Sequence, residues 1–151
     1  PDAETWRGGN HTGMAYTTRH SGRRIRRLFA DLGYDPYYTN AVKCFPSDGA
    51  GSNREPTAGE RANCRGHLLA EVEAVAPAVV VATGAHATRS LLAVEGESLE
   101  GFVESVLDPR PLPTLDATLL PLLHPSYQDV WLSRLGLDET TYRERIAAAL
   151  P

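Results

Sequence analysis

The most constraining feature of the sequence is a short run of β-branched and small apolar residues, 79–82, bounded by Gly84 and followed by a helix-forming stretch, 85–92. Runs that are apolar along their whole length are typical of buried parallel strands. A second apolar run, 118–123, predicts another strand despite Pro121. Strands that alternate with helical segments indicate an α/β layer structure.

The rest of the chain continues this alternation of helix and strand. Ser21 is placed to begin one helix and Gly33 to end it. Thr57 and Glu60 have the spacing of a capping box for another helix, which Pro77 would close. The further expected elements are helices over 21–32, 57–75 and 139–150, strands over 37–42 and 102–106, and a loop over 46–56.

This order of elements predicts one α/β domain over residues 1–151, a three-layer α/β/α structure with a mostly parallel central sheet. Ligands of such sheets bind at the carboxyl ends of the strands. Three segments follow expected strand ends or lie near them, namely 40–44, 84–86 and 124–127. Because folds of this kind carry many chemistries, the residues themselves must decide the function.

Composition and charge narrow the class of protein. The chain has 151 residues, 42% of them apolar, which suits one soluble domain. It shows neither a long apolar run nor a charged-then-apolar leader, so we expect a cytoplasmic protein without a membrane span. The net charge of -4 does not indicate nucleic-acid binding, but a local basic cluster does, unless it is a solvated helix face. The cluster consists of Arg19, His20, Arg23, Arg24, Arg26 and Arg27.

Three side chains near the expected strand ends and loops are candidates for ligand binding. Taken alone, Asn40 is typical of a turn residue that bonds local backbone, and His124 of a strand-end histidine with an internal partner. Tyr16 taken alone is typical of an exposed loop residue. Their neighbours in the sequence change this interpretation.

Residues 38–44, Tyr-Thr-Asn-Ala-Val-Lys-Cys, and residues 124–127, His-Pro-Ser-Tyr, resemble the second and third motifs of the uracil-DNA glycosylase superfamily. The resemblance is closest to its iron-sulfur families 4 and 5. Residues 13–17, Gly-Met-Ala-Tyr-Thr, resemble the family segment in which an aromatic ring stacks on the flipped base. The resemblance spans residues 8–148 and implies the glycosylase fold.

The resemblance implies a monofunctional DNA glycosylase that uses water to leave an abasic site in base-excision repair. Asn40 would select uracil, because an amide offers the acceptor and donors that complement N3–H and O4. His124 would stabilise the departing uracilate through O2. Tyr16 would stack on the base where relatives commonly have Phe, and Gly84 and Ser126 would complete the base site.

The same resemblance implies a monomer whose partner is uracil-containing DNA. Tyr127 and Gln128 would begin a loop that enters the duplex as the base leaves. Arg23 and Lys43 would contact DNA through its phosphates.

Cys44 and Cys64 are the only cysteines, and by themselves they are typical of buried free thiols. The resemblance instead implies that they are the third and fourth ligands of a 4Fe-4S cluster. The family's first two cysteines and its first motif, which places the attacking water, are not visible, so we expect a fragment of a longer chain. Asp2 and Glu4 are the nearest acidic candidates for the water.

Two other functions remain open. The first is a catalytically silent glycosylase-fold module that binds nucleic acid. The second is a general nucleotide-binding α/β domain that holds an anion at a helix N-terminus beginning with Gly84 and Ala85.

Overall fold

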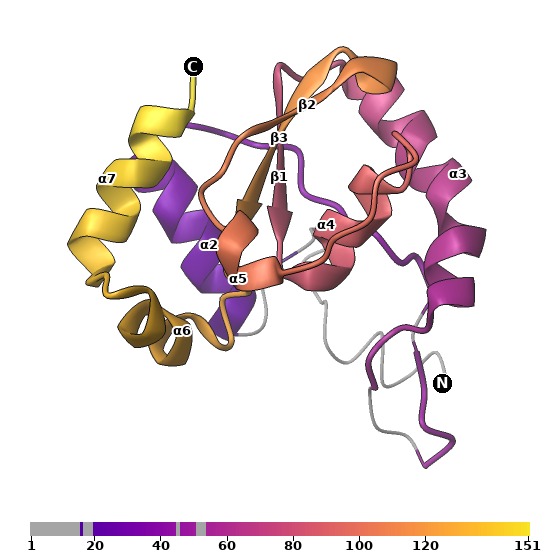
Figure 1. The fold of residues 1–151 in the computed structure, drawn as a ribbon, viewed down its shortest axis with the longest axis horizontal. Helices are drawn as coiled ribbons and strands as arrows, with labels where there is room; N and C mark the ends of the chain where they lie inside the picture. Colours follow the sequence, from indigo (N-terminus) through magenta and orange to yellow (C-terminus); the bar gives the residue numbers. More distant parts are fainter. Residues whose placement is uncertain (1–15, 17–19, 45, 51–53) are drawn as a thin grey trace. The chain divides into compact units, whose positions relative to one another are not determined.

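A computed structural model gives the fold of the chain and describes residue 16 and residues 20–44, 46–50 and 54–151 (Figure 1). The described chain divides into two compact units, and the division falls between Leu68 and Leu69, inside the helix α3 (Ala58–Val75). In the first unit α3 begins after the helix α2 (His20–Asp31) and an irregular segment. No helix among the described residues is both long and apolar enough to cross a membrane.

The second unit is built on a three-stranded sheet with the strand order β1-β3-β2 (Figure 1). Strand β1 (Val79–Thr83) pairs in parallel with the central strand β3 (Ala117–Leu122), in a register that aligns Val79 with Thr118. Strand β2 (Arg110–Leu112) pairs with β3 in the antiparallel sense. Both runs that predicted strands, 79–82 and 118–123, are therefore strands, and the expected mixed α/β class is confirmed.

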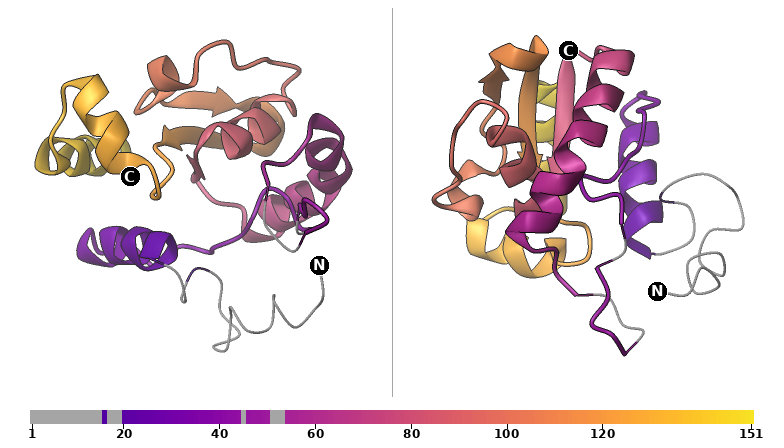
Figure 2. Two further views of the ribbon diagram at one scale, coloured as in Figure 1. Left: turned by 90° about the horizontal axis from the view of Figure 1, so that it is seen from below. Right: turned by 90° about the vertical axis from the view of Figure 1, so that its right-hand side faces the viewer.

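Helices border this sheet. Helix α4 (Ala85–Leu92) packs against β1 and β3, and helix α6 (Gln128–Leu135) packs against helix α7 (Glu139–Ala149). Two views place α4 on one side of β3 and the α6–α7 pair on the other (Figures 1 and 2). The short helices α5 (Phe102–Ser105) and η1 (Pro113–Leu115) lie in the connections on either side of β2.

The core of the second unit lies around β3, whose second half is fully buried. Leu119 and Leu120 are 0% exposed, as is Ile146 of α7. Burial of a leucine or isoleucine side chain stabilises the fold by about 1.5 to 3 kcal/mol. The remaining core side chains of this unit include Ala82, Leu91, Leu92, Leu112, Leu122, Leu123, Leu132 and Tyr142.

Local sequence signals explain the ends of the two helices of the first unit. The N–H of Thr57 donates to Glu60 at 2.8 Å, and the N–H of Glu60 donates to the Thr57 hydroxyl at 3.2 Å, which confirms the capping box of α3. Helix α3 ends two residues before Pro77, as predicted. Gly33, with φ +84°, follows the last turn of α2, also as predicted.

The structure corrects four expectations about individual elements. Residues 37–42 form no strand, residues 102–105 form α5 instead of a strand, and residues 128–135 form a helix where a loop was expected to begin. Ser21 lies inside α2 and does not cap it. The described sheet has one parallel and one antiparallel pairing.

Candidate functional site

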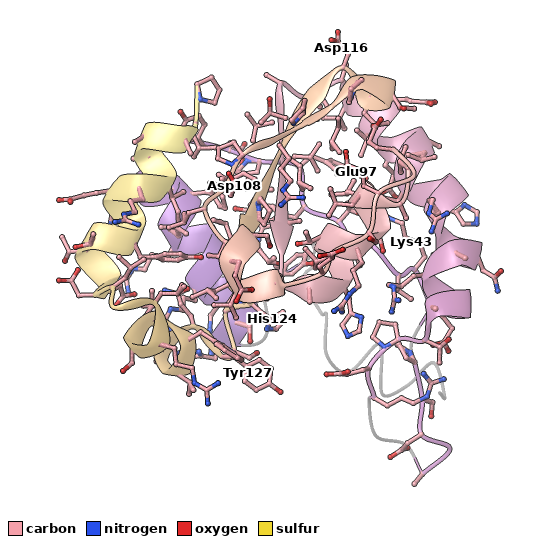
Figure 3. All side chains as sticks on the ribbon, in the orientation of Figure 1. Lys43, Glu97, Asp108, Asp116, His124 and Tyr127 are labelled. Carbon is pink, nitrogen blue, oxygen red and sulfur yellow. The ribbon has the colours of Figure 1, made fainter. Side chains whose placement is uncertain are left out.

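His124 lies at the end of the central strand of the second unit. Strand β3 ends at Leu122, Leu123 is 1% exposed, and the His124 side chain then reaches the surface. Figure 3 shows His124 and Tyr127 at the end of the sheet opposite Asp116, which precedes β3. The chain turns here because the N–H of Tyr127 donates to the carbonyl of His124 at 2.9 Å.

The turn fixes which ring nitrogen of His124 carries the proton. The backbone N–H of Ser126 donates to Nδ1 of His124 at 3.2 Å. Because a backbone N–H can only donate, Nδ1 is the acceptor nitrogen of the neutral ring, and the proton is on Nε2. Desolvation of the ring lowers the pKa of His124 below its ordinary value, although part of the side chain reaches solvent. The site therefore presents a neutral imidazole with an Nε2–H donor.

Gly84 supports His124 from the side of β1. It precedes α4 with φ +92°, and its N–H donates to the carbonyl of Leu122 at 2.8 Å. A Cβ atom on Gly84 would lie 3.2 Å from Cβ and 3.5 Å from Cδ2 of His124. Only glycine combines this backbone conformation with this close approach. The N-terminus of α4, the positive end of its dipole, consequently lies beside the imidazole.

Tyr127 and Gln128 follow His124 but have different surroundings. Tyr127 is 62% exposed, and its ring centroid lies 6.0 Å from that of His124. Gln128 is only 6% exposed because it begins α6 and turns inward. The expectation that Gln128 lies in a loop is thus wrong, while its contact with DNA stays a prediction. Tyr127 remains a candidate for DNA contact.

In the first unit the structure brings Tyr16 to Asn40. The Tyr16 hydroxyl lies 2.8 Å from Oδ1 of Asn40 and 2.9 Å from the carbonyl oxygen of Thr39. An amide oxygen has two lone pairs, so Oδ1 can accept from the hydroxyl and from a ligand at once. Asn40 is exposed, so its amide is accessible to a ligand. Burial raises the pKa of the Tyr16 phenol above its ordinary value, so the phenol keeps its proton.

Several contacts hold Tyr16 in place. Its backbone has φ +62°, and it lies against Gly22 of α2 so closely that a Cβ there would be 2.5 Å from the Tyr16 carbonyl oxygen. The Tyr16 ring lies 5.8 Å from the ring of Tyr38, which the Arg26 guanidinium covers at 4.3 Å. Such cation–π contacts are worth about 0.5 to 1 kcal/mol at exposed sites. Tyr16 is therefore part of a packed arrangement.

Lys43 joins the Asn40 segment to α3. Its ammonium donates to the Thr39 hydroxyl at 2.6 Å, and its backbone N–H donates to Sγ of Cys64 at 3.3 Å. The hydrogen bond from the Lys43 backbone lowers the pKa of the Cys64 thiol. Arg23, the other expected phosphate contact, is exposed on α2.

Cys44 and Cys64 lie close enough for their thiols to hydrogen-bond, with Cys44 exposed and Cys64 buried in α3. A pair of thiols from a loop and a helix fits two corners of a 4Fe-4S cluster, which takes four cysteine ligands. The chain has two cysteines. Within the part of the chain that the structure describes, no group of three His, Cys, Asp or Glu side chains could hold a metal ion. The residues present fit half of the ligand set.

The predicted site residues consequently form two groups, one in each unit. The first unit brings together Tyr16 and Asn40, and also Lys43, Cys44 and Cys64. The second unit brings together Gly84, His124, Ser126 and Tyr127. Asp2 and Glu4 lie outside the described residues.

Sequence reasoning missed three residues that support these groups: Gly22, Tyr38 and Tyr142. Tyr38 lies inside a recognised motif, so its aromatic ring two residues before Asn40 was an available signal. Gly22 belongs to the sequence stretch that leads on from residues 13–17, so its position was also a signal, although the sequence did not reveal its contact with Tyr16. Tyr142 had no local signal, because its contact with Leu123 depends on how α7 packs.

A comparison with known families identifies the class of this mixed α/β protein. The model of the family described as "Uracil DNA glycosylase superfamily" matches residues 4–150, and the chain belongs to this superfamily. The resemblance inferred from the two motifs is thereby confirmed.

Curated relatives include glycosylases of two types. The chain is 35% identical over 111 residues to the type-5 uracil-DNA glycosylase of Pyrobaculum aerophilum, a match that covers 63% of this chain and 47% of the relative. It is 34% identical over 122 residues to the type-4 uracil-DNA glycosylase of Thermotoga maritima, with 77% and 57% covered. A type-4 enzyme of Archaeoglobus fulgidus is 33% identical over 72 residues, with 46% and 34% covered. The chain spans about half the length of the first two relatives.

Proposed function

We propose that residues 1–151 belong to one three-layer glycosylase domain that removes uracil from DNA by hydrolysis of the N-glycosidic bond. The observation that carries this proposal is the state of His124, a neutral imidazole whose Nδ1 is occupied by the N–H of Ser126. Its Nε2–H can donate to a ligand without a change of protonation. The superfamily assignment and the relatives support the choice of reaction.

In this mechanism His124 acts on the leaving group. As the glycosidic bond breaks, negative charge develops on the uracil O2, and the Nε2–H bond strengthens with that charge. The N-terminus of α4, which begins at Gly84 beside the imidazole, adds a fixed positive potential in the same place. Because uracil leaves as a stabilised anion, the base needs no covalent attachment to the protein.

Asn40 would select the base. Its Oδ1 would accept from N3–H and its Nδ2 would donate to O4, whereas cytosine presents a donor and an acceptor in the opposite order. A wrong base would leave these polar groups unpaired, which costs about 1 to 3 kcal/mol for each buried group. The Tyr16 ring would supply the stacking surface, and Ser126 would close the turn that carries His124.

Three other side chains would bind the DNA. Tyr127, 62% exposed and next to His124, would fill part of the space that the flipped nucleotide leaves. Arg23 and Lys43 would contact phosphates, so affinity should fall as salt rises. Water would be the nucleophile, and an abasic site the product.

We propose in addition that Cys44 and Cys64 supply two of the four ligands of a 4Fe-4S cluster, with the others outside these 151 residues. The cluster would fix the Asn40 segment to α3 through Cys44 and Cys64. Its role would be structural, because hydrolysis of the glycosidic bond involves no oxidation or reduction. Iron and acid-labile sulfide analysis of protein purified without oxygen tests this, and a protein free of both would contradict it.

The decisive experiment is uracil release from an oligonucleotide with one uracil, using the protein as expressed from its own gene. We expect His124→Leu, which removes the donor and keeps a side chain of similar size, to lower kcat by about 100- to 1,000-fold, the usual loss for one donor to a developing oxyanion. The matched control is His67→Leu, at an exposed position on α3, and it should leave release unchanged.

Asn40→Asp provides the second test. A carboxylate keeps the shape of the amide but has no N–H to donate to O4, so uracil release should fall strongly. If the wild-type protein binds the DNA but releases no uracil, the result would instead indicate a catalytically silent binding module. Equal release by wild type and His124→Leu would contradict the mechanism.

A further inference from the structure

Tyr142 of α7 contacts the backbone just before His124. The Tyr142 hydroxyl accepts the N–H of Leu123 at 2.9 Å, and both residues are buried, at 2% and 1% exposed. Leu123 lies one residue beyond β3, so no strand pairing is assigned to it. A buried N–H without an acceptor is destabilising, and the Tyr142 hydroxyl removes that penalty.

A second hydrogen bond acts on the preceding residue from the other side of the strand. The carbonyl of Leu122 accepts the N–H of Gly84, at the start of α4, at 2.8 Å. Consecutive residues are thus held by two different helices, Leu122 by the N-terminus of α4 and Leu123 by the Tyr142 side chain of α7. His124 is the next residue, and its Cβ lies against Gly84.

We propose that Tyr142 is a positioning residue for His124, a role that rests on the proposed glycosylase function. By holding the N–H of Leu123, the hydroxyl sets the direction in which the chain leaves β3. That direction decides whether the turn closes so that the N–H of Ser126 meets Nδ1. Tyr142 would reach neither the base nor the DNA, since it is buried and acts through the backbone.

Placement on this scale matters for the reaction. A displacement of about 1 Å in a group that must meet a developing charge can cost about 100-fold in rate. Hydrogen bonds from both α4 and α7 limit such displacement of the end of β3. With the α4 contact alone, the backbone positions of Leu123 and His124 would vary more. The hydroxyl of Tyr142 should therefore affect kcat more than substrate binding.

The test removes one oxygen atom. In the protein as expressed from its own gene, Tyr142→Phe keeps the ring in the core and deletes the acceptor. We expect kcat for uracil release to fall by about 10- to 100-fold with KM for DNA changed less than about twofold. We also expect exchange of the Leu123 amide hydrogen to become about 10-fold faster or more.

A matched control separates positioning from loss of stability. Ile146→Val lies one turn further along α7, at a side chain that is 0% exposed, and removes one buried methyl group without affecting the hydrogen bond. It should lower the melting temperature, as Tyr142→Phe should, and leave kcat and the Leu123 exchange rate near wild type. If both variants reduce kcat equally, Tyr142 has only a structural role and the inference is overturned.

NMR of the His124 imidazole tests the inference without activity. In the wild type the neutral ring should carry its proton on Nε2. Tyr142→Phe should increase the population of the Nδ1–H tautomer or of rings that exchange between the two tautomers. An unchanged His124 spectrum with unchanged Leu123 exchange would refute the positioning role. Failure of the wild type to release uracil, with these NMR changes present, would refute the glycosylase function and leave the positioning role intact.

Discussion

Removal of the hydroxyl oxygen from Tyr16 separates the two tasks proposed for this residue. The hydroxyl lies 2.8 Å from Oδ1 of Asn40 and 2.9 Å from the carbonyl oxygen of Thr39, whereas the ring is the proposed stacking surface. A hydrogen bond between neutral groups is worth about 0.5 to 1.5 kcal/mol net. Tyr16→Phe should therefore lower kcat/KM for uracil release by about 2- to 12-fold, through a less well oriented Asn40.

Removal of the whole ring should cost more. Stacking of a base on an aromatic ring contributes about 1 to 3 kcal/mol. Tyr16→Ala should accordingly lose a further factor of about 5 to 150 beyond the loss in Tyr16→Phe. The two variants together divide the contribution of Tyr16 into a hydroxyl part and a ring part.

The assay is single-turnover uracil release from a single-stranded oligonucleotide, which avoids the cost of opening a duplex. Tyr37→Phe is the matched control, because the Tyr37 side chain is 60% exposed, and it should behave as wild type. Equal losses in Tyr16→Phe and Tyr16→Ala would refute the stacking role. No loss in Tyr16→Phe would show that the contact with Asn40 does not position the amide.

Three further predictions concern the neighbours of the site and the fold. Gly84→Ala places a Cβ atom 3.2 Å from His124 at φ +92°, so it should lower stability by about 1 to 2 kcal/mol in denaturant titrations and slow uracil release; wild-type values in both would contradict the close contact. Glu60 has a pKa of about 2 because of Arg54 and the N–H of Thr57, so the stability it adds is present above its ordinary pKa of 4.5 and lost as pH falls toward 2. The melting temperature of wild type should exceed that of Glu60→Gln at pH 7 and approach it near pH 2, and a constant difference would refute this. Because the pKa of His124 is lowered in the folded protein, the unfolded chain takes up the His124 proton at a higher pH than the folded protein does, and the free energy of unfolding should fall as pH drops below 6.5. An NMR titration that gave the folded protein a His124 pKa at or above 6.5 would contradict this.

The parallel pair of strands could be predicted from the sequence because its signal is local. Residues 79–82 and 118–123 are almost entirely apolar, which is typical of short strands buried on both faces, and Gly84 follows the end of the first strand. The capping box of Thr57 and Glu60 is likewise complete within four residues. In both cases the residues that form the element are the same residues that carry the sequence signal for it.

The failed predictions concern segments whose partners are distant. Residues 37–42 have the aromatic composition of a strand, but Tyr38 is covered by the Arg26 guanidinium and Asn40 contacts Tyr16, and no strand pairs with them among the described residues. Gln128 was expected in a loop, yet it is buried at the start of α6. Tertiary contacts outweighed local preference in each case.

For the candidate site, the motifs predicted the side chains but not their support. The proximity of Tyr16 and Asn40 agrees with the expectation that both act on one base, although only the structure reveals the hydrogen bond between them. The bond between Tyr142 and Leu123 joins residues that no motif connects, and it depends on how α7 packs. A single sequence carries no signal for such a contact.

Under the proposed function, Gly22 offers a way to change the substrate range without any change at a residue proposed to contact the base. It is buried in α2, and any larger side chain there would displace the carbonyl of Tyr16. A displaced Tyr16 would move its hydroxyl away from Asn40 and tilt the aromatic surface. Variants selected for activity on other damaged bases should therefore arise at position 22 as well as at the positions that would contact the base, and a search restricted to the pocket would overlook them.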